Sequence, residues 1–101
     1  MMESFENIVA MEKLYFDIGG DLGLLNDKLA SLYFDARNKR LIMKKEKEYK
    51  SIAAFNAEYK DSEIYVDLKR VGYMVEGLQK MMAGIRVRVE SLRAETRTGA
   101  Y

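Results

Sequence analysis

The sequence predicts an all-α protein: a hairpin of two long antiparallel helices with a shorter N-terminal helix, packed in the manner of a coiled coil. Three observations predict this fold. The 101 residues include no proline, which would break a helix interior, and the chain is rich in residues that favour helix. Apolar residues recur at spacings of three and four along most of the chain. One short polar segment, residues 60–63, offers a turn between the long helices.

The most regular stretch covers residues 64–92. Its apolar positions alternate between spacings of four and three: Ile64, Leu68, Val71, Val75, Leu78, Met82, Ile85, Val89 and Leu92. We call these nine residues the 64–92 seam. A strict seven-residue repeat keeps one apolar stripe against neighbouring helices and predicts left-handed supercoiling. Gly77, Gly84 and Ser91, also seven apart, form a column of small residues beside it.

The seam has two open interpretations. Met74 and Met81 widen its apolar face beyond what a two-stranded coiled coil requires. The face therefore either forms the core of a bundle within one chain or joins subunits of a homo-oligomer. In the second case the predicted oligomerisation residues are Leu68, Val71, Val75, Leu78, Met82, Ile85, Val89 and Leu92.

The remaining elements follow from caps and spacing. The first helix is predicted over about residues 4–18, with Ser4 as its N-cap. Residues 19–21, Gly-Gly-Asp, are typical of a C-cap followed by a new N-cap. The apolar spacing continues in phase across them, which favours a kink or short interruption, with a true loop as the alternative.

The second helix is predicted over about residues 22–59, with a change of apolar phase midway, after Ala36. Asp61 or Ser62 can cap a third helix, predicted over about residues 63–95. Residues 96–101 lack periodicity and are predicted to fray. At this length the whole chain, 1–101, is predicted to be a single helical domain.

Composition excludes several function classes. Cysteine and histidine are both absent, which removes disulfides, thiolate metal sites, the usual general base and the commonest transition-metal ligand. No nucleophile, phosphate-loop or zinc motif is present. We expect no enzyme activity, no metal and no cofactor. No apolar run reaches 18 residues and no signal peptide is apparent, so the expected location is the cytoplasm, without membrane contact.

Charges alternate in blocks along the chain, although the net charge is +1. Residues 1–36 hold seven acids and two bases, and residues 37–50 hold seven bases and two acids. Residues 51–67 hold four acids and one base, and residues 68–101 hold seven bases and three acids. Such segregation points to partners or helix pairs of opposite charge.

The basic block contains a candidate nucleic-acid site. Arg37, Arg40, Lys44 and Lys47 follow spacings of three, four and three, which place them in one stripe on a helix. We call these four residues the basic stripe. Aromatic residues bracket the block, and single-stranded nucleic acid is held by basic grooves with aromatic stacking platforms. The alternative is a solvated face or an ion-pair partner, since Lys44 and Glu48 form a favourable i,i+4 pair.

Three segments of the C-terminal half carry a resemblance to a known family: residues 64–67 (IYVD), 72–78 (GYMVEGL) and 83–85 (AGI), followed by the Arg-rich helix end at 86–93. With a basic helix and a turn before them, residues 37–99 resemble the recombination mediator proteins of tailed phages, the UvsY type. The resemblance implies an all-α subunit that assembles into a ring, with the C-terminal helix important for assembly. It also implies single-stranded DNA binding through the preceding basic helix and loading of a recombinase.

Two functions remain open. The first is an oligomeric accessory protein that binds single-stranded DNA in recombination or replication, with itself, the DNA and DNA-processing proteins as partners. The second is a small helical interaction module, such as an adaptor or a phage-encoded inhibitor, whose charged blocks select protein partners by electrostatic complementarity. Salt-dependent binding to single-stranded DNA separates them.

Overall fold

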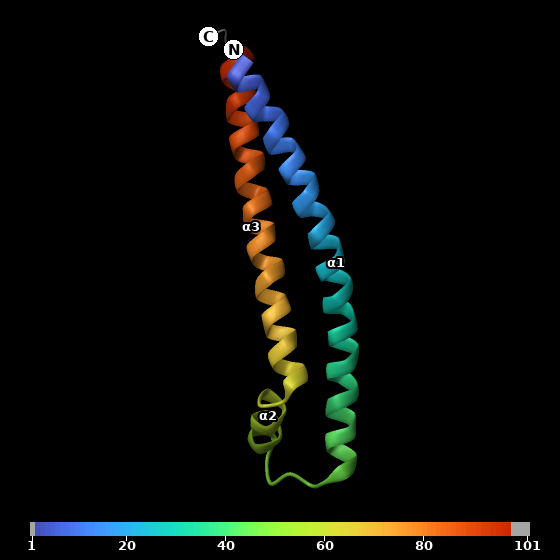
Figure 1. Ribbon diagram of the computed structural model, residues 1–101. Coiled ribbons are helices and arrows are strands. Elements are labelled where there is room, and N and C mark those ends of the chain that lie inside the picture. The colour runs from blue at the N-terminus through green and yellow to red at the C-terminus, as the bar shows by residue number, and fades with distance from the viewer. Residues whose placement is uncertain (1, 98–101) are drawn as a thin grey trace. The chain divides into compact units, whose positions relative to one another are not determined.

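The computed structural model describes residues 2–97, and every regular element in that range is a helix. Helix α1 covers Met2–Glu46, α2 covers Ile52–Lys60 and α3 covers Glu63–Arg97 (Figure 1). The all-α prediction is confirmed, because only helices are present in residues 2–97, and the two long helices pack against each other. The described chain divides into two compact units. Unit 1 combines the residues up to Leu24 with those from Glu76 onward, and unit 2 is Leu25–Val75.

The prediction of a separate N-terminal helix over residues 4–18 is wrong, because α1 continues through Gly19 and Gly20 without a break. Neither glycine adopts the left-handed conformation that a C-cap would need. Ile18 is buried and Leu22 is half-buried, so the apolar face stays in phase across the glycines. Packing of that face outweighs the cost of about 1 kcal/mol for each glycine in a helix interior. The Ser4 side chain, the predicted N-cap, lies outside the described residues.

The prediction of one helix over residues 22–59 is also wrong, because α1 ends at Glu46 and α2 begins at Ile52. The Ser51 side chain caps α2, since its Oγ accepts a hydrogen bond from the Ala54 amide at 3.1 Å. Lys44 and Lys45 lie in the last turn of α1, where positive charge suits the helix dipole. The predicted change of apolar phase after Ala36 is wrong, because Met43, seven residues after Ala36, is buried and Ile42 is 48% exposed.

Helix α3 follows after a short turn and agrees with the prediction of a helix over residues 63–95. Ser62 caps it, with its Oγ accepting a hydrogen bond from the Tyr65 amide at 3.3 Å, and Glu63 lies in the first turn. The tail predicted to fray at 96–101 falls partly inside α3, and its last four residues lie outside the described residues.

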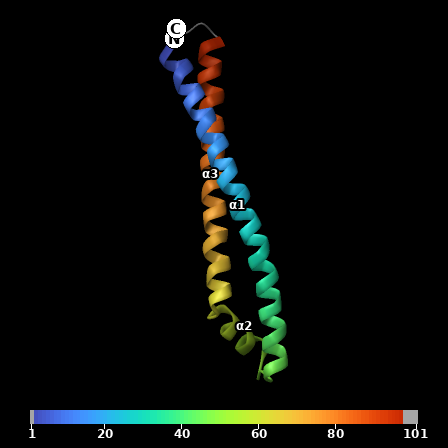
Figure 2. The same cartoon turned by 45° about the vertical axis from the view of Figure 1, so that its right-hand side comes forward.

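In unit 1 the first part of α1 and the last part of α3 lie side by side (Figures 1 and 2). Ile8, Val89 and Leu92 form the buried cluster, and Met11 and Ile85 pack against it. The Met82 methyl lies 3.6 Å from where a Cβ would stand on Gly19, and Arg93 forms an ion pair with Glu12. Residues later in α1 contact residues earlier in α3, so the two segments are antiparallel.

Unit 2 contains the rest of α1, all of α2 and the beginning of α3. Its buried residues are Ala36, Met43, Val71 and Val75, at 2–6% exposure, and none of them comes from α2. Helix α2 therefore contributes half-buried aromatic rings to this unit, and these rings build the site described below. No helix in residues 2–97 has the length and apolar character needed to cross a membrane.

Candidate nucleic-acid interface

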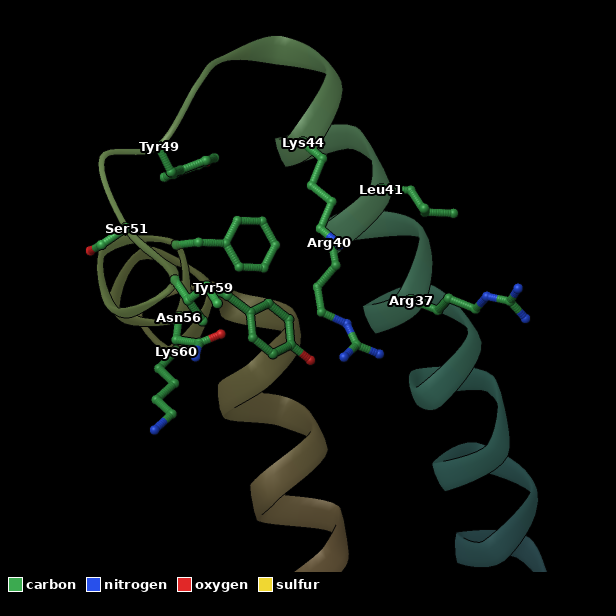
Figure 3. A pocket seen from close by; sticks show the side chains of 11 residues that line it. Arg37, Arg40, Leu41, Lys44, Tyr49, Ser51, Asn56, Tyr59 and Lys60 are labelled. Carbon is green, nitrogen blue, oxygen red and sulfur yellow. The ribbon is translucent and has the colours of Figure 1, made fainter.

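A groove of about 930 Å³ lies in unit 2, between the end of α1 and helix α2 (Figure 3). We call it the cationic groove. Its lining comprises Arg37, Arg40, Leu41, Lys44, Tyr49, Ser51, Ile52, Phe55, Asn56, Tyr59 and Lys60. Four of these side chains are cationic and three are aromatic, and the described lining contains no carboxylate. The volume is at the upper end of the range for small-ligand sites, roughly 300–1,000 Å³.

Two cations of the basic stripe lie over aromatic rings of α2. The Arg40 guanidinium carbon is 5.4 Å from the centre of the Tyr59 ring, and Figure 3 shows this side chain extending toward that ring. The Lys44 Nζ is 5.5 Å from the centre of the Phe55 ring. Both distances fall within the roughly 6 Å limit of a cation–π contact. Arg37 points away from α2 in Figure 3 and lies at the rim of the groove.

The aromatic rings form a connected set. Tyr49 packs edge-on against Phe55, with ring centres 5.0 Å apart, and Tyr59 packs in the same manner against Tyr65 at 5.2 Å. Phe55 and Tyr59 are four residues apart on α2, and both are half-buried. Aromatic side chains beside cations are the form that stacking platforms take in single-strand binding proteins.

The energies favour exchange of a cation for a base over these rings. An exposed cation–π contact is worth roughly 0.5–1 kcal/mol, whereas stacking of a base on an aromatic side chain is worth roughly 1–3 kcal/mol. Arg40 and Lys44 have long, exposed side chains, so each can move from its ring to a phosphate oxygen. The groove can therefore hold a base and its phosphates at once.

The structure separates Lys47 from the other members of the basic stripe. Lys47 follows the end of α1, and its Nζ donates to Glu58 Oε1 at 2.8 Å. The Tyr49 hydroxyl donates to the other oxygen of the same carboxylate. Arg37, Arg40 and Lys44 thus line the cationic groove, while Lys47 lies on another side of α2 and has a negative partner.

The contacts of Glu58 change two pKa values. Hydrogen bonds from Lys47 and then from Tyr49 lower the pKa of Glu58 below its usual range. Partial burial, the hydrogen bond to Glu58 and the negative charges of Glu58 and Glu46 raise the pKa of Tyr49 to about 12, from an ordinary value of 10.0. The carboxylate therefore holds residues 47–49 against α2 while it is ionised.

We expect the Tyr49 phenol to titrate near pH 12. The folded chain keeps this proton where the unfolded chain loses it, so the contribution of this group to stability is complete below pH 10 and is lost as the pH rises from 10 to 12. The difference in phenolate absorbance between the native chain and Tyr49→Phe isolates the transition. Glu58→Gln should return it toward pH 10, whereas a native transition at pH 10 would contradict the contact.

Sequence reasoning did not identify three polar groups of the groove: Ser51, Asn56 and Lys60. The available signal was the N-cap pattern at Ser51, which starts α2 and turns its side chains back toward α1. A prediction of one continuous helix left these residues on a separate stretch of surface. The break at residues 47–51 brings them to the same groove as Arg40.

The eight predicted oligomerisation residues are directed toward the interior of the chain. Val71, Val75, Val89 and Leu92 are buried, and Leu68, Leu78, Met82 and Ile85 are half-buried. The first three of the eight belong to unit 2 and the others to unit 1. Their role between subunits stays a prediction.

No metal centre in residues 2–97 and no known relative indicates what this groove binds. In residues 2–97, no three acidic side chains come together in a way that could hold an ion. Comparison of the chain with protein-family models, curated proteins and solved structures finds no match.

Proposed function

We propose that the protein binds single-stranded DNA in the cationic groove and acts as an accessory protein of recombination or replication. The observation that carries the proposal is the meeting of four cations and three aromatic rings in one groove whose described lining has no carboxylate. Positive grooves with aromatic platforms bind single strands, because phosphates supply affinity and every base can stack.

Two cations and two aromatic rings of the groove carry the binding in this proposal. Arg40 and Lys44 leave their rings and bind successive phosphates, the guanidinium as a fork and the ammonium as a point charge. Phe55 and Tyr59 then each stack a base. Stacking is tolerant of sequence, so we expect little base preference.

Two further parts of the proposal rest on the sequence pattern. The resemblance of residues 37–99 to UvsY-type mediators supports a role in recombinase loading, with DNA-processing proteins as partners. The heptad spacing of the 64–92 seam supports knobs-into-holes packing of α3. We propose in addition that the chain self-associates, since an assembly would present several grooves to one strand and raise its avidity.

Titration of a fluorescent oligothymidylate with the native chain at several salt concentrations tests DNA binding. If Arg37, Arg40, Lys44 and Lys60 all meet phosphates, the slope of log affinity against log salt should be about −3 per subunit engaged, from −0.7 for each contact. An oligoadenylate of the same length should give the same slope and a similar affinity.

A duplex of the same length is the control, because paired bases cannot stack on Phe55 and Tyr59. We expect the single strand to bind more tightly than the duplex at every salt concentration. Absence of binding at low salt would overturn the proposal and favour the protein-interaction module.

A further inference from the structure

Helix α1 carries apolar residues on a side of unit 1 that the rest of residues 2–97 leaves exposed. Phe5, Val9 and Phe16 are 68%, 50% and 77% exposed. Their spacings of four and seven place them on one face of α1, away from the cluster that contains Ile8. Gly20 and Gly23 continue this face, and a Cβ on either would meet nothing within 4 Å. We call these five residues the α1 outer face.

Helix α3 carries a complementary surface in the same unit. Gly77, Gly84 and Ser91 are all exposed, and a Cβ built on either glycine meets nothing within 4 Å. We call these three residues the α3 column. Nothing in the contacts among residues 2–97 explains two helix-weakening glycines at this spacing, because the space above them is open.

Charge indicates that another copy of this chain covers these faces. The charges of the two segments are opposite. Residues 2–24 of α1 contain five acids and one base, and residues 76–97 of α3 contain three acids and five bases. Contact between α1 segments of two copies would place acid against acid. Contact between α1 of one copy and α3 of the other places acid against base.

We propose that the chain self-associates by packing the α1 outer face of one copy on the α3 column of another. Val9, Phe16 and Gly23 are seven apart, as are Ser91, Gly84 and Gly77. Antiparallel alignment sets Phe16 of one copy into the space over Gly84 of the next, with Val9 opposite Ser91 and Gly23 opposite Gly77. This inference rests on the self-association in the proposed function and gives it a surface other than the 64–92 seam.

The test compares molecular mass by sedimentation at about 50 µM chain with helicity by circular dichroism. We expect the native chain to be larger than a monomer. Phe16→Glu should reduce it to a monomer with its helicity kept, because Phe16 is 77% exposed within the chain. Phe34→Glu is the matched control, since Phe34 is 65% exposed on the part of α1 in unit 2 and lies outside the proposed contact.

A second variant should raise the stability of α3 and weaken self-association. Gly84→Leu should raise the thermal stability of α3, because leucine favours helix over glycine, and should still lower the mass to that of a monomer, because the side chain fills the space for Phe16. Gly72→Leu is its control outside the column. Adding Phe16→Ala to Gly84→Leu exchanges the large and small positions and should restore association.

A monomeric native chain would overturn the inference, as would Phe16→Glu or Gly84→Leu variants that keep the native mass. DNA binding is measured separately on the Phe16→Glu variant. Its cationic groove lies in unit 2, so the salt slope per subunit engaged should be unchanged. Loss of association and loss of DNA binding are thereby distinguished.

Discussion

The double variant Arg40→Glu with Lys44→Glu is expected to weaken binding of single-stranded DNA about 100-fold at 0.15 M salt. Loss of two phosphate contacts accounts for about 10-fold through the counterions that are no longer released, and repulsion of phosphates by the two carboxylates accounts for about as much again. The salt slope should fall from about −3 to about −1.4, because two of the four contacts remain. The same titration of oligothymidylate measures both quantities.

The matched control is Lys28→Glu with Lys45→Glu, which changes the net charge equally on the same helix. Both lysines are exposed and neither lines the cationic groove. We expect this variant to lose a small part of its affinity for single-stranded DNA, because its net charge is more negative. Its salt slope should equal that of the native chain. If the Arg40 and Lys44 variant binds as the native chain does, the groove is a solvated face.

Val89→Asp is expected to unfold much of unit 1. Val89 is 8% exposed and lies in the cluster with Ile8 and Leu92. An unpaired carboxylate placed there costs several kcal/mol, or raises its own pKa to avoid ionisation. Domains of this size have about 5–15 kcal/mol of stability, so thermal unfolding followed by circular dichroism should begin many degrees lower.

Val87→Asp is the control two residues earlier on α3. Val87 is 63% exposed, and surface substitutions usually change stability by no more than about 0.5 kcal/mol. Measurements at submicromolar chain keep any association out of the comparison. Equal unfolding midpoints for the two variants would contradict the assignment of the buried face of α3.

The groove shows how much the spacing of residues along one helix can predict. Arg37, Arg40 and Lys44 line one groove, and their spacing along the helix was sufficient to predict that they lie close together. Lys47 has the same spacing, but its partner is Glu58, eleven residues away and on another helix. The spacing of residues along α1 does not predict that Lys47 pairs with Glu58. Whether a cation binds a ligand or a carboxylate of its own chain depends on where the next helix lies.

By itself the sequence determined the helical class, the start of α3 at Glu63 and the burial of seam residues such as Val71 and Val75, because these depend on propensity, capping and period. Tertiary structure decided the rest. Gly19 and Gly20 stay helical because Ile18 and Leu22 pack on either side of them, an energy that local glycine preference does not contain. Residues 47–51 leave the helix because Ser51 caps a new one and Glu58 holds Lys47 and Tyr49. That break sets α2 beside α1 and places the Phe55 and Tyr59 rings beneath Lys44 and Arg40.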